Sequence, residues 1–171
     1  MNIALANFLA HSVELESEAR QRYQELSEML AQHHNVEVAE FFARMAHEAS
    51  EHLAEVQALA QGHTLPRLHA WEFDWPEPEA PESASYEALH YRMSLMQAVD
   101  LALHNERAAR DYYAGYAQRA EQTDDAETAA VAQHFAAEEQ SHAEQLEALL
   151  QTLQPESPYA ALEDDEPHMP E

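Results

Sequence analysis

An internal repeat with an offset of 90 residues constrains the fold of this chain more than any other feature of its sequence. Residues 16–23, ESEARQRY, align without a gap with residues 106–113, ERAARDYY, and share Glu, Ala, Arg and Tyr. Residues 45–59 align at the same offset with residues 135–149, and the shared residues there include a histidine. Ala, Glu and Leu matches are common between helical sequences, but a histidine match at a constant offset is not. The chain is therefore expected to contain two copies of one supersecondary unit.

The composition favours long helices, because the 171 residues include only two glycines and are rich in Ala, Glu, Gln and Leu. Asn35 and Asp124 are the expected N-caps of the second and fourth helices, and Glu127 would complete a capping box with Asp124. Apolar residues at three- and four-residue steps predict four helices, at about residues 2–33, 35–62, 85–121 and 124–154.

Short connections join the first helix to the second and the third to the fourth, so each pair is expected to form an antiparallel hairpin. The longer connection, about residues 61–84, is rich in proline and acidic residues and would cross the length of the bundle. The expected architecture is an all-α four-helix bundle at residues 1–154, made of two hairpins and a long crossover. Residues 155–171 are expected to form an acidic, flexible tail.

The charge balance and the absence of cysteine exclude several classes of function. A formal net charge of −25 disfavours binding to nucleic acid or to anionic membranes. No apolar run is long enough to span a bilayer, and a cytoplasmic location is expected. Without cysteine the chain cannot form disulfides, iron–sulfur clusters or thiolate metal sites, so histidines and carboxylates are the remaining strong metal ligands.

Four repeat-related polar residues interrupt the apolar stripes of the predicted helices. Glu16 and Glu106 lie among apolar neighbours, as do His52 and His142, and each Glu precedes its His by 36 residues. Equal spacing in two matching hairpins can place all four at one level of a bundle. Because a buried, unpaired carboxylate is costly, a shared metal site is the leading interpretation. A buried polar network that fixes the helix register without metal is the alternative.

The two copies differ at one position that matters for metal binding. Glu139 lies three residues before His142, so both can face inward from adjacent turns, but Ala49 occupies the corresponding position before His52. Glu48 is a possible substitute, although its repeat equivalent lies beside an intact Glu139. Carboxylates with imidazoles suit iron, manganese or zinc, and bridging carboxylates suit two metal ions held close together.

These residues support a resemblance to a known family. The pattern E-x-x-A-R-x-x-Y at residues 16–23, with a Glu on each of two helices and Glu-x-x-His on a third, resembles the rubrerythrin-like branch of the ferritin-like di-iron carboxylate superfamily. The resemblance implies a ferritin-like bundle with a di-iron centre that reduces peroxide or oxidises ferrous iron. Tyr23 and Tyr113 would hydrogen-bond the ligand carboxylates. The ligands it implies are Glu16, His52, Glu106, Glu139 and His142.

Two departures from the family pattern qualify what the resemblance implies. The rubredoxin domain of full-length rubrerythrins is absent because the sequence has no cysteine, so an enzyme would need an external electron donor. Ala49 removes one bridging carboxylate. A di-metal oxidoreductase, as a homodimer or larger homo-oligomer, is therefore the leading hypothesis. The alternative is a non-enzymatic metal-binding or scaffold protein of the same fold with a degraded metal site.

Overall fold

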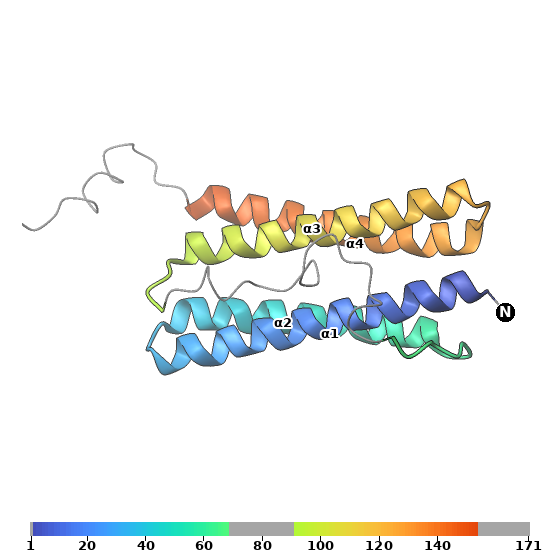
Figure 1. Cartoon of the computed structure of the whole chain (residues 1–171). Coiled ribbons are helices and arrows are strands. Elements are labelled where there is room, and N and C mark those ends of the chain that lie inside the picture. The colour runs from blue at the N-terminus through green and yellow to red at the C-terminus, as the bar shows by residue number, and fades with distance from the viewer. Residues whose placement is uncertain (1, 69–90, 154–171) are drawn as a thin grey trace, which may run out of the picture.

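The computed structural model describes residues 2–68 and 91–153, and these form a bundle of four long helices (Figure 1). The helices are α1 (Ile3–Gln32), α2 (Val36–Ala60), α3 (Leu95–Gln122) and α4 (Ala126–Leu153). One layer is the antiparallel hairpin of α1 and α2, and the other is the hairpin of α3 and α4. The all-α prediction of two hairpins is confirmed. Most of the crossover and the whole predicted tail lie outside the described residues.

The turns inside the two hairpins have the same backbone geometry. His34 and Asp124, which are 90 residues apart, have positive φ angles of 62° and 57°. The next residue in each turn, Asn35 or Asp125, donates its backbone N–H over 2.9 Å to a carbonyl of the preceding helix. The sequence repeat is therefore also a repeat of local structure.

Asp125, rather than the predicted Asp124, caps α4. Its carboxylate accepts hydrogen bonds from the backbone N–H of Thr128 at 3.2 Å and from the Thr128 hydroxyl at 2.6 Å. Asp124 cannot occupy this position because an N-cap residue is normally extended, whereas Asp124 is in the left-handed region. Asn35 is at the N-cap of α2 as predicted, but its side chain makes no capping hydrogen bond.

The predicted start of the third helix near residue 85 is wrong for the residues that can be compared, since residues 91–94 are not helical. Ser94 is extended at the N-cap of α3, and its side chain accepts from the backbone of Gln97. The Gln97 side chain accepts from the backbone N–H of Ser94 in return, which completes a capping box. The apolar periodicity continues through this cap, so it did not reveal the helix boundary.

Side-chain hydrogen bonds at the two ends of the bundle correspond approximately to each other under the repeat. This correspondence indicates an approximate two-fold axis between the hairpins. At one end Asn2, the N-cap of α1, donates to Asp125 of the other hairpin at 2.9 Å. At the other end Asn35 donates to the carbonyl of Met93 at 2.8 Å, just before α3. The repeat offset carries the first of these contacts approximately onto the second. The hairpins thus pack as two similar units that face each other.

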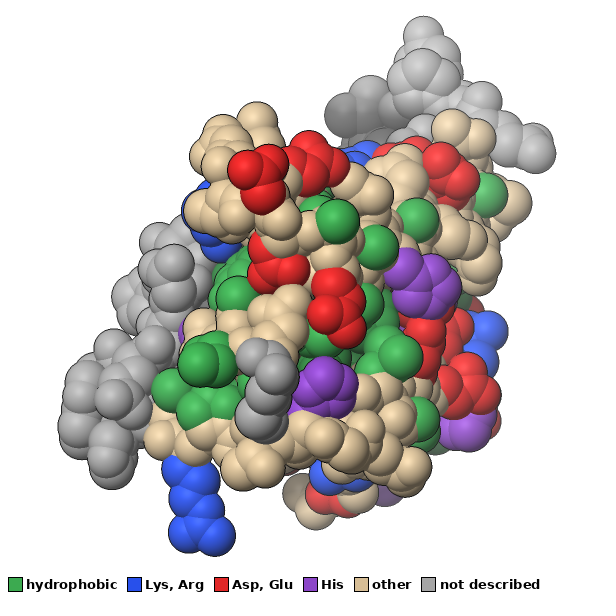
Figure 2. All heavy atoms as spheres, turned by 90° about the vertical axis from the view of Figure 1, so that its right-hand side faces the viewer, with side chains coloured by type: hydrophobic (Ala, Val, Ile, Leu, Met, Phe, Trp, Pro, Cys, Tyr) green, Lys and Arg blue, Asp and Glu red, His purple; other side chains and the backbone are tan. Residues whose placement is uncertain are grey.

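Two apolar clusters form the core, and the same two-fold relation exchanges them. Repeat-equivalent pairs such as Tyr23 and Tyr113, or Met45 and Phe135, are divided between the clusters. No described helix has an apolar stretch that could span a membrane. In the end-on view of Figure 2, several groups of Asp and Glu side chains lie among hydrophobic side chains, and Lys and Arg lie at the margins. This charge distribution favours cations near the surface.

Candidate metal centre

Buried polar side chains from all four helices lie within the otherwise apolar core. Glu16 of α1, Glu106 of α3 and Glu139 of α4 are 1%, 3% and 0% exposed. His52 of α2 and His142 of α4 are half-buried. All five residues at which the sequence predicted ligands are therefore buried or half-buried, and we call these five side chains the buried layer.

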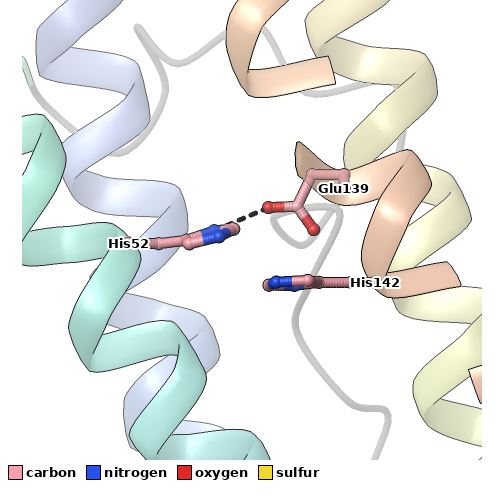
Figure 3. A group of neighbouring side chains, drawn as sticks. All are labelled: His52, Glu139 and His142. Atoms are coloured by element: carbon pink, nitrogen blue, oxygen red, sulfur yellow. Dashed lines mark ion pairs between the residues drawn. The ribbon is translucent and has the colours of Figure 1, made fainter. Parts of the chain in front are cut away.

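His52, Glu139 and His142 approach each other across the boundary between the hairpins (Figure 3). The Nδ1 atom of His52 lies 2.8 Å from Oε1 of Glu139 and 3.6 Å from Oε1 of Glu16. The rings of His52 and His142 are stacked, with centroids 4.7 Å apart. One potential ligand atom from each of the three labelled residues lies within 4.8 Å of the other two. A single cation could contact all three after small side-chain movements.

A tyrosine from the opposite hairpin orients Glu16. The hydroxyl of Tyr113 donates to Oε1 of Glu16 at 2.9 Å, and both side chains are buried. The expected contact between Tyr113 and a buried carboxylate is present, although the carboxylate belongs to the other copy of the repeat. Tyr23 is equally buried and stacks on Phe42, with ring centroids 5.9 Å apart. Its expected contact with a carboxylate remains a prediction.

The buried groups shift the protonation equilibria of one another. Burial raises the pKa of Glu16, although the nearby His52 opposes this shift. Burial, followed by the charge of Glu139, raises the pKa of Glu106 well above its usual value. Burial also disfavours the charged form of Glu139, but its close contacts with the Glu106 and His52 side chains outweigh this effect and lower its pKa. Burial lowers the pKa of His52, whereas Glu139 and Glu16 together raise it to about 11. Without a metal, a protonated His52 therefore offsets negative charge at Glu139.

Carboxylate oxygens without hydrogen bonds show that this layer fits a cation. Oε2 of Glu16, Oε2 of Glu106 and both carboxylate oxygens of Glu139 are buried, and none makes a hydrogen bond to a described residue. The 2.8 Å contact of Glu139 with His52 is an ion pair without hydrogen-bond geometry. A closed polar network would satisfy these oxygens, because each buried unsatisfied acceptor costs roughly 1–3 kcal/mol. Oxygen and imidazole donors together match iron, manganese or zinc.

Ala49 leaves the donor set asymmetric. Its side chain is buried in the core, one turn before His52. Glu48, the possible substitute, is half-buried beside Arg44 and Gln145 and lies outside the group of three in Figure 3. The charge of Glu48 contributes to the raised pKa of Glu106, so the two carboxylates interact.

A second group of potential ligands was missed in the sequence. Glu55 of α2 lies close to His134 and Glu138 of α4, again with one ligand atom of each within 4.8 Å of the other two. Burial, followed by the neighbouring Glu55, raises the pKa of Glu138 to about 7. The spacing of four residues between His134 and Glu138 was visible in the sequence. The approach of Glu55 was not, because this residue belongs to the other hairpin.

Comparisons with known proteins agree with this architecture and donor set. The rubrerythrin family model matches residues 7–93, and the ferritin-like domain model matches residues 72–155. The chain is also similar to an uncharacterized conserved protein from Magnetospirillum magnetotacticum MS-1, whose crystal structure was solved at 2.00 Å resolution. The two chains share 32% sequence identity, with a TM-score of 0.67, and their alignment covers 89% of this chain and 97% of the other. No curated protein matches the chain.

Proposed function

Because the chain belongs to the rubrerythrin family of ferritin-like proteins, we propose that its buried carboxylates and imidazoles bind a di-iron centre for oxidoreductase chemistry. The proposed reaction is reduction of peroxide or oxidation of ferrous iron. The observation that carries the proposal is the set of buried carboxylate oxygens without hydrogen bonds, next to two imidazoles. The proposed ligands are Glu16, His52, Glu106, Glu139 and His142.

The protein side chains would have distinct roles in this centre. Glu139 has no hydrogen bond on either oxygen and contacts a histidine of the other hairpin, so it would hold the metal together with donors of both hairpins. Glu16 and Glu106 would each complete one side of the site. Tyr113 would fix the orientation of Glu16 through its hydroxyl. Bound iron would supply the one-electron chemistry that these side chains lack.

Binding requires the layer to release its protons. His52 must lose a proton to coordinate a metal, and the raised pKa of Glu106 makes the deprotonated form of that carboxyl harder to reach. The incoming cation replaces the charge of those protons, which keeps the buried layer close to electrical balance. The sequence contains no cysteine that could hold an electron-transfer iron site, so an external donor would reduce the centre.

Glu48 is the candidate for the coordination position that Ala49 leaves empty. Its carboxylate is half-buried, and its charge already contributes to the raised pKa of Glu106. If the Glu48 side chain rotated toward Glu106, its carboxylate could serve as the ligand that is missing at Ala49. Manganese or zinc could occupy the same oxygen and nitrogen donors. We also propose that the protein assembles as a homodimer or larger homo-oligomer.

Ala49 favours one alternative, a metal-binding or scaffold protein of the same fold without turnover. A buried methyl group in place of a bridging carboxylate removes a negative charge and coordination positions. Such a site could still hold metal but would not keep two ions together through a redox cycle.

Iron content and turnover distinguish the two functions. The protein would be loaded with ferrous iron without oxygen, desalted and assayed for retained iron, ferric absorption and peroxide consumption with a chemical reductant. Retained iron with peroxide or ferrous iron turnover supports the oxidoreductase. Retained iron without turnover supports the metal-binding alternative. A protein that retains less than an equimolar amount of iron and shows neither signal would contradict the oxidoreductase proposal.

A further inference from the structure

The Glu55, His134 and Glu138 group forms a separate set of donors at the surface of the bundle, which we call the outer cluster. Nε2 of His134 lies 2.7 Å from Oε1 of Glu55 and 2.9 Å from Oε1 of Glu138. The three side chains are 56%, 34% and 27% exposed, in the order His134, Glu55, Glu138. One imidazole and two carboxylates from two helices therefore converge where solvent can reach them.

Glu138 connects the outer cluster to the buried layer. Its Oε1 atom contacts His134, while its Oε2 atom lies 3.6 Å from Nε2 of His52. His52 in turn contacts Glu139 through its other ring nitrogen. The path from the surface to a fully buried carboxylate with no hydrogen bond thus runs through two side chains.

A cavity of about 300 Å³ lies along the same path, between α2 and α4. Its walls include Glu55 and Glu138 of the outer cluster and both imidazoles of the buried layer, His52 and His142. Glu51 adds another carboxylate. A cation entering from solvent would meet oxygen and nitrogen donors along this path.

The approximate two-fold axis supplies an internal comparison. The repeat equivalents of Glu55, His134 and Glu138 are Gln145, Arg44 and Glu48. These three residues line a second opening between α2 and α4, with a volume of about 190 Å³. There an amide and a guanidinium replace a carboxylate and the imidazole, and a guanidinium cannot bind a metal cation.

The asymmetry between the two openings suggests a function for the outer cluster. We propose that Glu55, His134 and Glu138 bind a divalent transition-metal cation at the surface and that Glu138 transfers it to His52 of the buried layer. This inference rests on the proposed function only for the destination of the ion. The surface site itself is inferred from the geometry of the outer cluster. Mixed oxygen and nitrogen donors select Mn²⁺, Fe²⁺, Co²⁺ or Zn²⁺ over Mg²⁺ and Ca²⁺.

Cobalt(II) is a suitable probe, since its visible absorption reports coordination and it needs no reductant. Wild-type protein without bound metal would be titrated with Co²⁺ by equilibrium dialysis, and loading would be followed by stopped-flow absorption. We expect two classes of bound cobalt, a tight inner class and a weaker outer class. His134→Ala and Glu55→Gln should each remove the weaker class and slow inner loading on the order of tenfold.

His47→Ala is the matched control. His47 pairs with Glu51 four residues away, as His134 does with Glu138, but it lies outside the outer cluster. This variant should keep both classes of cobalt and the wild-type rate. If His134→Ala and Glu55→Gln match His47→Ala in both amount and rate, the inference is wrong.

A variant of the inner layer separates failure of this inference from failure of the proposed function. Glu139→Gln/His142→Ala should lose the tight class and retain the weaker one. If wild type shows only the weaker class, and His134→Ala abolishes it, the outer site stands and the buried metal centre does not. If wild type shows only the tight class, with a rate that His134→Ala leaves unchanged, the outer site is refuted. If neither class of bound cobalt is detected, the outer site and the buried metal centre are both refuted.

Discussion

Restoring the missing carboxylate in Ala49→Glu should have opposite effects on the metal-free and metal-loaded proteins. Ala49 is 6% exposed and is the repeat equivalent of Glu139. A glutamate here would place another carboxylate next to a layer that already contains three. Without a cation the added charge is unfavourable, whereas with a cation it becomes a ligand.

The size of both effects follows from the burial of this position. An uncompensated buried charge typically costs about 3–5 kcal/mol, and protonation of the new carboxyl brings the expected cost to the lower end, about 3 kcal/mol. For a protein of this size the melting temperature should fall by roughly 6–12 °C. In the loaded protein, each tenfold gain in metal affinity adds about 1.4 kcal/mol of stability at saturating metal. Metal should therefore raise the melting temperature of Ala49→Glu more than that of wild type.

Circular dichroism melts in chelator and in excess Mn²⁺ measure both effects. Ala49→Gln is the matched control, because it has nearly the same volume but no negative charge. It should share the packing cost of the glutamate without gaining extra stabilisation from metal. If Ala49→Glu and Ala49→Gln respond equally to Mn²⁺, position 49 does not face a cation site and the shared-site model is refuted.

Variants at three further positions test the roles of single side chains. Tyr113→Phe removes the buried hydrogen bond to Glu16 while keeping the ring, and should lower the free energy of unfolding in urea by about 1–3 kcal/mol. Asp125→Ala should cost about 1 kcal/mol at neutral pH through loss of the α4 cap, whereas Asp125→Asn should retain most of it. The hydrogen bonds from Thr128 lower the pKa of Asp125 below 3.8, so the charged cap contributes fully above that pH, and the contribution is lost as pH falls through the folded-state pKa. Glu48→Gln should reduce the iron retained per chain if Glu48 fills the position that Ala49 leaves.

Specific results would contradict each of these expectations. A Tyr113→Phe protein with wild-type stability would mean that the hydroxyl does not hold Glu16. Parallel stability profiles of wild type and Asp125→Asn between neutral pH and pH 3 would mean that the carboxylate charge has no role in the cap. Wild-type iron content in Glu48→Gln would remove Glu48 from the ligand set.

The repeat made the helices, the hairpins and the polar layer predictable. A single offset identified Glu16 with Glu106 and His52 with His142, and helical periodicity placed all four on inward-facing stripes. These features depend on positions along one helix or between matching helices. Predicting these features does not require knowledge of the contacts between side chains of different hairpins.

Contacts between the hairpins were not predictable by the same reasoning. Tyr113 binds the carboxylate of Glu16, and His52 pairs with Glu139, so both contacts join opposite copies of the repeat. Their geometry depends on the rotation of one hairpin relative to the other. His134 and Glu55 have no like residue at the repeat-equivalent positions, so the outer cluster gave no repeat signal. The shift of the α4 cap from Asp124 to Asp125 depends on a positive φ angle that the sequence Asp-Asp does not reveal.

Crystals grown with ferrous iron under anaerobic conditions provide the most direct test of the metal centre. An anomalous difference map recorded at the iron absorption edge should show density for two iron ions enclosed by Glu16, His52, Glu106, Glu139 and His142. Glu139→Gln/His142→Ala crystals of the same form should lose that density. A wild-type map without density among these five side chains, from crystals whose iron content has been verified, would contradict the account.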